Sequence, residues 1–221
     1  EFISSVSHEL KTPITLIQGY AEGLKVGIVT RQDDKLFYCD VIMDEAGKMN
    51  KLVTELLDLS QLEKGYFQLE KNAFNLSDLL ERLLSKYQPI FSDRVIIPQV
   101  EKPENLLVYA DPVRTEQILV NYLNNALNHL DQAKLLIIKL KKKDQKARAS
   151  VFNSGKTIPE EALDKVFESF YKIDRSRTRA YGGTGLGLSV VRAIQELDKN
   201  AYGVANRING VEFWFEVDLA E

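Results

Sequence analysis

The sequence predicts a chain of two domains, a helical hairpin in residues 1–65 and an α/β sandwich in residues 66–221. In the first part, apolar residues recur every three or four positions, which is the spacing of amphipathic helices. In the second part, strand-like and helix-like segments alternate, and two of the strands form an antiparallel hairpin. That pattern is typical of a sheet with helices on one face. The expected fold class is therefore multidomain, with an α domain followed by an α/β domain.

The composition is that of an ordinary globular protein and excludes several function classes. With 221 residues, of which 44% are hydrophobic, the chain can bury a core in one or two domains. The net charge of −3 gives no basis for nucleic-acid binding, which needs clustered excess Lys and Arg. The basic run at residues 139–146 is interpreted as a solvated hairpin. The single cysteine, Cys39, excludes an intramolecular disulfide and a cysteine-based metal cluster.

Residues 2–24 predict a helix that presents a histidine to solvent. Its apolar stripe consists of Ile3, Val6, Leu10, Ile14, Ile17, Ala21 and Leu24. At about 100° per residue, His8 and Thr12 point away from this stripe and lie one turn apart. Glu9 is adjacent to His8. Pro13 lies inside the helical pattern at a cost of about 3 kcal/mol, which usually marks a functional site. An exposed imidazole beside a carboxylate is suited to receive a phosphoryl group.

A second helix is expected after an interruption at Gly27 and residues 30–34, and it runs to about residue 62. Its apolar seam repeats as in a coiled coil. The seam consists of Ile42, Ala46, Met49, Val53, Leu56 and Ser60. A hairpin of two such helices cannot cover its own apolar stripe, so we expect two copies to pair as a four-helix bundle. The expected assembly is therefore a homodimer.

The elements of the second domain are predicted from helix caps, turn residues and short apolar runs. In chain order they are a strand at residues 67–69, a helix capped by Asn75 or Ser77 and ending at about Gln88, a strand at residues 106–109, a helix starting at Asp111 and Pro112, a hairpin at residues 135–152, helices at residues 160–167 and 188–197, and a strand at residues 211–219.

Two asparagine segments are candidates for nucleotide and metal contacts. Asn121 and Asn125 are four positions apart and share one helix face, where their amide oxygens could bind Mg²⁺ or belong to a buried polar network. Residues 153–157 follow a strand. The amide of Asn153 could accept from and donate to the edge of adenine, although an ordinary strand-to-helix turn explains the segment equally well.

The glycines of residues 182–187 indicate phosphate binding, because they open a helix and let backbone amides turn towards an anion. A dinucleotide fingerprint would require a preceding strand, which is missing here. The polar and basic residues 171–181 lie directly before the glycines. We expect this segment to act as a lid that closes cations over the phosphates of a nucleoside triphosphate.

Taken together, these motifs resemble those of the sensor histidine kinases of bacterial two-component systems, with a narrower resemblance to the Gram-positive vancomycin-resistance sensors. Five motifs occur in the family's order across nearly the whole chain. They are the phosphoacceptor box at residues 2–13, the N box at 121–125, the first glycine box at 153–157, the F box at 167–170 and the second glycine box at 183–187.

The resemblance implies a dimerisation and histidine-phosphotransfer hairpin joined to an ATP-binding domain of the Bergerat fold, with ATP and Mg²⁺ as cofactors. It implies histidine autophosphorylation, phosphotransfer to an aspartate of a response regulator, and phosphatase activity towards that regulator. The expected location is the cytoplasmic portion of a plasma-membrane protein. We expect an upstream segment, because the chain opens at Glu1 in mid-pattern.

The resemblance also assigns roles to single residues. His8 is the nucleophile, Glu9 shares its second ring proton, and Thr12 positions a water in the phosphatase reaction. Asn125 is the metal ligand and Lys172 neutralises the transferring phosphoryl group. The residues implied to bind the nucleotide are Asn121, Asn125, Asn128, His129, Asn153, Gly155, Thr157, Ile158, Tyr171, Lys172, Gly183, Thr184, Gly185, Leu186 and Gly187.

Three positions depart from the family's pattern. Asn153 stands where the first glycine box normally has Asp, Thr157 replaces its second glycine, and Asn128 with His129 replace basic or aromatic residues after the N box. These departures leave open a pseudokinase or a phosphatase-dominant dimeric scaffold. An ATPase that shares the same fold would explain the nucleotide motifs but not His8.

Overall fold

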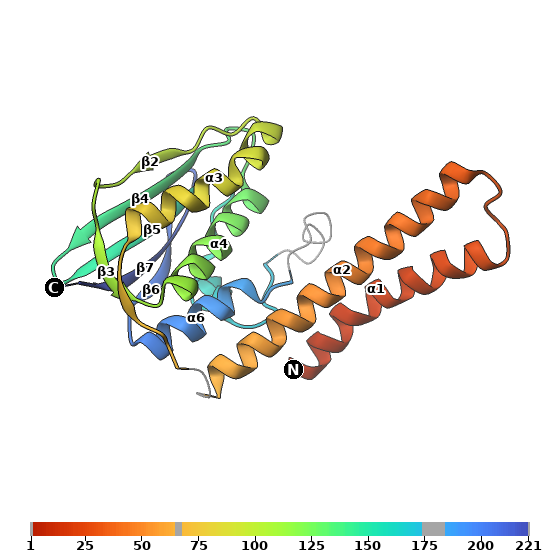
Figure 1. The fold of residues 1–221 in the computed structure, drawn as a ribbon, viewed down its shortest axis with the longest axis horizontal. Coiled ribbons are helices and arrows are strands. Elements are labelled where there is room, and N and C mark those ends of the chain that lie inside the picture. The colour runs from red at the N-terminus through yellow and green to blue at the C-terminus, as the bar shows by residue number, and fades with distance from the viewer. Residues whose placement is uncertain (1, 65–67, 174–183, 221) are drawn as a thin grey trace. The chain divides into compact units, whose positions relative to one another are not determined.

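The computed structural model describes residues 2–64, 68–173 and 184–220. The contacts divide the chain into two compact units, residues 1–58 and 59–221. The fold class expected from the sequence is confirmed, because a helical hairpin precedes a sheet that carries helices on one face (Figure 1).

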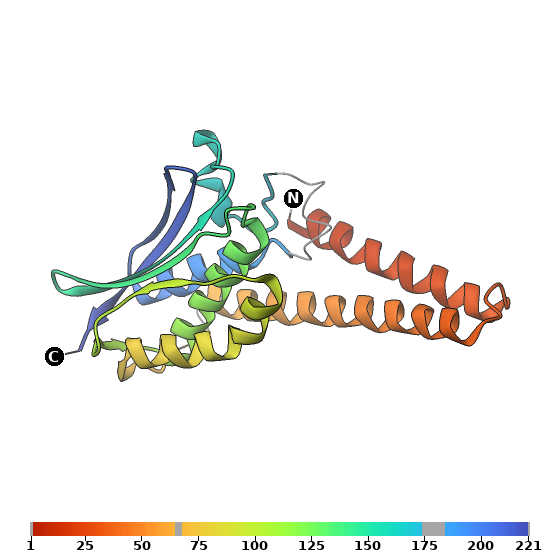
Figure 2. The ribbon, with the colours of Figure 1, turned by 90° about the horizontal axis from the view of Figure 1, so that it is seen from above.

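The first unit is built on two antiparallel helices, α1 (Phe2–Lys25) and α2 (Gln32–Glu63), which lie side by side in both views (Figure 1, Figure 2). Helix α1 continues through Pro13. Helix α2 begins at Gln32. Residues 30–34 were expected to interrupt the helical pattern, and this expectation was wrong for residues 32–34. Asp33 and Asp34 lie in the first turn, where negative charge stabilises a helix N-terminus.

The hairpin leaves much of its apolar surface uncovered. Ile3 is 80% exposed and Met43 is 71% exposed. Further exposed apolar residues on the two helices are Phe2, Ile14, Leu16, Leu36, Phe37, Val53 and Leu57. Two helices packed only on each other cannot remove these side chains from water, as the sequence pattern indicated.

The second unit contains, among the described residues, a seven-stranded sheet with the order β1-β3-β7-β5-β4-β2, and β6 pairs with β7. Its strands are β1 (Asn72–Asn75), β2 (Gln99–Glu101), β3 (Leu107–Ala110), β4 (Leu136–Lys143), β5 (Lys146–Ser154), β6 (Tyr202–Arg207) and β7 (Gly210–Leu219). All neighbouring strands are antiparallel except β2 and β4.

Helices α3 (Leu76–Arg94), α4 (Pro112–His129) and α6 (Gly187–Asp198) form a layer over one face of the sheet (Figure 1, Figure 2). The core lies between the layers. Tyr122 of α4 is fully buried there, with its ring 5.5 Å from that of Phe213 and 6.0 Å from that of Phe215 in β7. The burial of these aromatic side chains holds α4, which carries the N box, against the sheet.

Both helix starts expected from local sequence are confirmed. The side chain of Asn75 accepts a hydrogen bond from the amide of Ser77 at 3.0 Å. Asp111 caps α4 and accepts from the amides of Val113 and Arg114 at 3.0 and 3.1 Å. The hairpin of β4 and β5, the closing strand β7 and helix α6 also lie where the sequence placed them.

Other expectations were wrong. Residues 68–69 are not in a strand, and the first strand is β1, which needs β3 as its partner; residue 67 lies outside the described residues. Helix α3 runs past Gln88 and through Pro89 to a left-handed residue at Val95. Residues 160–167 form two short turns, η1 (Glu160–Ala162) and η2 (Lys165–Phe167), instead of one helix.

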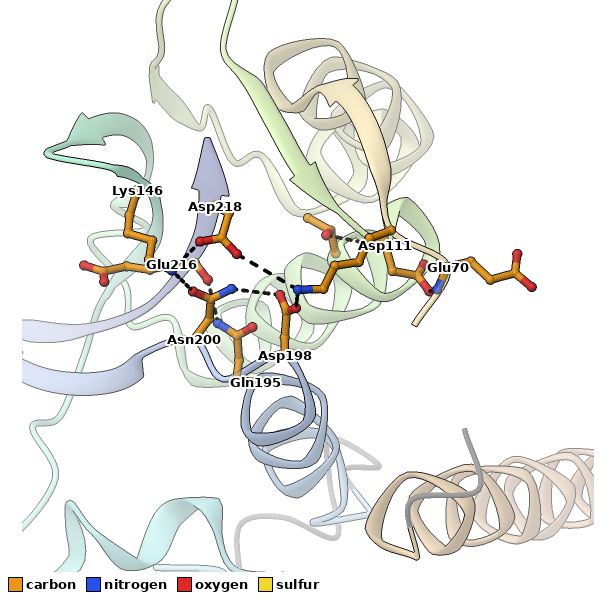
Figure 3. Close-up of polar contacts among 10 residues, drawn as sticks. Glu70, Asp111, Lys146, Gln195, Asp198, Asn200, Glu216 and Asp218 are labelled. Carbon is orange, nitrogen blue, oxygen red and sulfur yellow. Dashed lines mark hydrogen bonds and ion pairs between the residues drawn. The ribbon is translucent and has the colours of Figure 1, made fainter. Parts of the chain in front are cut away.

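Two contacts fix the chain where it enters the α/β unit (Figure 3). The amide of Glu70 donates to Asp111 at 3.0 Å, on the carboxylate oxygen that does not cap α4. Lys71 forms an ion pair with Asp198, the last residue of α6, and its ammonium lies 4.0 Å from Asp218 of β7. Residues 70 and 71 are therefore fixed to the start of α4 and the end of α6.

We expect Asp111→Ala to lower the free energy of unfolding by about 2 kcal/mol, because it removes a helix cap and also the acceptor of the Glu70 amide. Asp111→Asn is the matched control, since its amide oxygen can still cap α4, and it should cost clearly less. Urea denaturation of the three proteins measures the difference. Equal losses for both variants would contradict the capping role.

The face of the sheet opposite the helices carries acids whose pKa values are lowered. Burial raises the pKa of Glu216, but hydrogen bonds and charges from Arg148 and Lys143 outweigh it and hold the pKa below the ordinary 4.5. Burial also raises the pKa of Asp218, while Lys146, Asn200 and Lys71 lower it below 3.8. The folded protein thus binds these protons more weakly than the unfolded chain. These pairs stabilise the fold above about pH 4.5 and lose that effect as the pH falls.

We therefore predict that the free energy of unfolding of Glu216→Gln changes less between about pH 5 and pH 3 than that of the parent protein. The parent should lose stability as Glu216 takes up a proton, whereas the amide cannot titrate. Urea titrations at several pH values measure both slopes. Identical slopes would show that the Glu216 ion pair does not contribute to acid stability.

Candidate nucleotide-binding site

Segments that are far apart in sequence meet at one end of the helical layer. Gly155, just after β5, lies so close to the last residue of α4 that a Cβ on it would be 2.5 Å from the carbonyl oxygen of His129. The φ of Gly155 is +148°, a conformation that side chains rarely adopt. Its amide donates to the carbonyl of Asn209 in the β6–β7 turn at 3.0 Å. The first glycine box is thereby held against the end of the N-box helix.

The second glycine box packs on the F box and on the N box. A Cβ on Gly185, whose φ is +77°, would be 3.0 Å from the Cα of Phe170 and 3.2 Å from the Cε of Lys172. The amide of Phe170 donates to the carbonyl of Gly185 at 2.9 Å. A Cβ on Gly187 would lie 2.9 Å from the side-chain oxygen of Asn121. The structure thus brings together the three nucleotide motifs that the sequence predicted, and adds the F box as a contact.

The polar residues of α4 differ in how far they are buried. Tyr122 is fully buried, Asn121 and Asn125 are half-buried, and His129 is exposed. Asn128 is also half-buried. This gradient places the amides of the N box at the edge of the core, where they can reach a ligand and still be held by packing.

A neighbouring asparagine in α4 has a structural role. Asn124 accepts a hydrogen bond from the hydroxyl of Tyr87 in α3 at 2.9 Å. Burial raises the pKa of Tyr87, and this bond only partly offsets the effect. Asn124 therefore ties α4 to α3 and keeps the N-box face oriented.

Asn153 lies at the end of β5 and is only 2% exposed. Its side-chain nitrogen donates to the carbonyl of Ser154 at 3.1 Å, so one of its two N–H groups is used within the protein. Ser154 is in turn fixed, because its hydroxyl donates to Asp131 at 2.6 Å and accepts from the amide of Leu135 at 3.0 Å. Asn153 is therefore a buried side chain that is partly hydrogen-bonded within the protein. Its expected contact with adenine remains a prediction.

The start of α6 has the features of an anion site. Its first turn contains no acidic residue, and within the described part of the chain no side chain caps it. Leu186, just before the helix, is fully buried, and its amide donates to the hydroxyl of Thr184 at 3.4 Å. Uncapped helix amides and the helix dipole favour an anion such as a phosphate.

The remaining nucleotide candidates differ in their accessibility. Tyr171 and Lys172 are half-buried, Ile158 is 8% exposed, and Thr157 is exposed. Gly183 and most of the expected lid, residues 174–181, lie outside the described residues.

The candidate phosphoryl acceptor lies in the first unit. His8 and Thr12 are exposed on α1, as the helical spacing predicted, and Glu9 is half-buried beside them.

A divalent cation at this site would be bound by asparagine side-chain oxygens of the protein and by phosphate oxygens of the nucleotide. Within the described residues there is no group of three or more His, Cys, Asp or Glu side chains that could hold a metal ion. An Asn oxygen with phosphate oxygens and water is nevertheless a donor set that suits Mg²⁺.

In the part of the chain that the structure describes, no helix has the combination of length and apolar character that crossing a membrane requires.

Sequence reasoning missed Asn206 of β6, which contacts Ile158, the residue directly after the first glycine box. Its side chain forms hydrogen bonds with both backbone groups of Ile158, at 2.9 and 2.7 Å. Asp131, the partner of Ser154, was missed as well. Their partners are 48 and 23 positions away in the chain, and only an asparagine or an aspartate next to a turn could have hinted at them.

The two parts of the chain match two known protein families. Residues 110–221 match the family described as "Histidine kinase-, DNA gyrase B-, and HSP90-like ATPase". Residues 1–65 match the "His Kinase A (phospho-acceptor) domain".

Individual relatives extend the likeness over both parts of the chain. Sensor protein SrrB of Staphylococcus aureus is 33% identical over 196 residues, which are 89% of this chain and 34% of SrrB. The chain therefore spans about a third of the length of that curated relative. The solved structure of the Acinetobacter baumannii histidine kinase AdeS has a TM-score of 0.80 at 25% identity and covers 97% of this chain and 98% of its own.

Histidine kinase ThkA offers two further structures. Its catalytic domain is 33% identical, covers 67% of this chain and 95% of its own, and has a TM-score of 0.61. A second structure shows ThkA in complex with the response regulator protein TrrA. It has a TM-score of 0.79 at 28% identity and covers 99% of this chain and 61% of its own.

We predict that Gly155→Ala weakens ATP binding by at least about tenfold, because the new methyl group would meet the His129 carbonyl and α4 would have to move. The matched control is Gly47→Ala in α2, where nothing lies within 4 Å of the added Cβ. That variant should bind ATP like the parent. Calorimetric titration measures both. Equal affinities for all three proteins would show that Gly155 does not shape the site.

Proposed function

Because this chain belongs to the histidine kinases of bacterial two-component systems, we propose that it phosphorylates its own His8 with ATP and passes the phosphoryl group to an aspartate of a response regulator. The observation that carries the proposal is the convergence of Asn121, Lys172 and Gly185 at the start of α6. The first glycine box adds to it, because Gly155 lies against the end of α4. We place the boundary between the phosphotransfer and ATP-binding domains after residue 65.

The proposed reaction follows from the chemistry of the residues. Nε2 of His8 attacks the γ-phosphorus of ATP, so that an N–P bond forms while the bond from phosphorus to the bridging oxygen breaks and ADP leaves. Glu9 accepts or shares the proton on Nδ1 and so favours the nucleophilic form of the ring. Lys172 offsets negative charge on the phosphoryl group during transfer.

The metal site is part of this proposal. Asn125 would ligate Mg²⁺, with Asn121 supporting it, while the remaining ligands would be phosphate oxygens and waters. When bound, Mg²⁺ would neutralise charge on the β- and γ-phosphates. The half-buried position of both amides on one face of α4 supports the assignment.

The proposed partners are a second copy of this chain and a response regulator. The exposed apolar residues of α1 and α2, including Ile14 and Val53, are the surface that a second copy would cover in a four-helix bundle. The regulator is proposed because ThkA, which resembles this chain, was solved in complex with the response regulator TrrA. We propose no nucleic-acid partner.

We also propose that these domains work in the cytoplasm as part of a longer, membrane-bound sensor, since ATP and response regulators are cytoplasmic and the similar SrrB is called a sensor protein. The narrower likeness to the vancomycin-resistance sensors stays a prediction. So does the phosphatase activity, for which Thr12 would orient the attacking water.

A pseudokinase or a phosphatase-dominant scaffold is the second candidate, favoured by Asn153 in place of the family's Asp. A simple ATPase is less well supported. It would need a base before the N box, and Glu116 in that region is paired with Lys86 at 2.7 Å.

We predict that His8→Gln forms no phosphoprotein, while its ATP affinity stays within about twofold of the parent, because His8 lies outside the ATP-binding domain. Thr12→Ala, one turn along the same exposed helix face, is the control and should still be phosphorylated. Incubation with γ-labelled ATP and Mg²⁺ measures both.

The stability of the label decides between the functions. A label on the protein that survives alkali but not acid indicates phosphohistidine. Free phosphate without labelled protein indicates an ATPase, and neither product indicates the scaffold. Alkali-stable label on His8→Gln would overturn the assignment of the acceptor.

A further inference from the structure

The segment between β5 and η1 is held from one side, by the hairpin of β6 and β7. At one end of this segment, the amide of Gly155 donates to the carbonyl of Asn209 in the hairpin's turn at 3.0 Å. At the other end, Ile158 is held by Asn206 of β6. The exposed residues Lys156 and Thr157 lie between these two anchors.

Asn206 is a polar residue on the apolar side of its strand. In the pairing of β6 with β7 it lies opposite Val211, which is 4% exposed. Tyr202 lies four residues earlier and therefore on the same face of the strand, and its ring is 4.9 Å from that of Phe167. The next residue, Arg207, is on the other face and pairs with Glu212 at 2.7 Å. An amide in a position suited to an apolar side chain needs partners of its own.

Both partners of this amide come from one residue. The side-chain nitrogen of Asn206 donates to the carbonyl of Ile158 at 2.7 Å, and the amide of Ile158 donates to the side-chain oxygen of Asn206 at 2.9 Å. A residue of a neighbouring strand would make the same two hydrogen bonds to Ile158 with its own backbone N–H and C=O groups. The carboxamide of Asn206 therefore attaches residue 158 to the edge of the sheet without a further strand.

We infer that Asn206 is a positioning residue for the base end of the nucleotide site. It fixes the position of Ile158 and, through the chain, that of the neighbouring Thr157. The inference rests on the proposed function, in which these residues surround the purine of a nucleoside triphosphate. The phosphate end depends instead on Gly185 and the start of α6. Loss of Asn206 should therefore weaken recognition of the base and leave the transfer step intact.

The first experiment compares Asn206→Ala with Arg207→Ala, which breaks a different contact in the same hairpin. Autophosphorylation kinetics should show that Asn206→Ala raises the KM for ATP about tenfold, with kcat within about twofold of the parent, and narrows the preference for ATP over GTP. Arg207→Ala should leave all of these values unchanged.

Asn206→Asp supplies the second readout. As a carboxylate it can accept from the Ile158 amide, but its other oxygen faces the Ile158 carbonyl; once protonated, it regains a donor at that place. The half-buried position and the facing carbonyl both favour the protonated carboxyl and should raise its pKa above the ordinary aspartate value. Its KM for ATP, divided by that of the parent, should therefore fall as the pH is lowered from about 8 to about 5. The same ratio for Asn206→Ala should stay flat. This variant also serves if Asn206→Ala does not fold.

The outcomes separate the two proposals. If the parent neither binds ATP nor prefers it to GTP, the proposed function fails. If the parent does both, unchanged KM and nucleotide preference in Asn206→Ala overturn the inference, as does a pH-independent ratio for Asn206→Asp. A lower melting temperature alone, with these values unchanged, would mean that Asn206 only stabilises the fold.

Discussion

The close approach of Gly155 to the carbonyl of His129 is the constraint on which the site depends. It leaves no room for a side chain and joins the end of α4 to the loop after β5. Gly185 makes a similar close approach to Phe170 in the F box. The buried contact of Tyr122 with Phe213 keeps α4 on the sheet, so these backbone contacts form at a fixed place. A ligand therefore meets a frame that packing has already assembled.

Local signals in the sequence were reliable because they act over a few residues. Asn75 and Asp111 cap the helices that follow them, and the glycines before α6 mark its start. The exposed position of His8 followed from helical periodicity alone. Each of these features needs only its neighbours in the chain to form.

The features that the sequence did not predict depend on distant partners. Strand β6 contains Gly203, which no short pattern marks as a strand, and it exists because β7 pairs with it and Trp214 covers that glycine. Strand β2 has three residues and forms beside β4. Asn206 binds Ile158 across 48 positions. In η1 and η2 the residues Ala162, Val166 and Phe167 are buried, but the backbone turns too tightly for one continuous helix.

The anchors of Glu70 and Lys71 have a mechanical consequence. They attach the incoming chain to the N-cap of α4 and the last residue of α6 (Figure 3). Asn125 and Gly187 lie towards the opposite ends of those helices. An α-helix is stiff along its axis, with a rise of about 1.5 Å per residue. A displacement of residues 70 and 71 is therefore passed to both helices that contribute to the candidate nucleotide site, and through Lys71 also to β7.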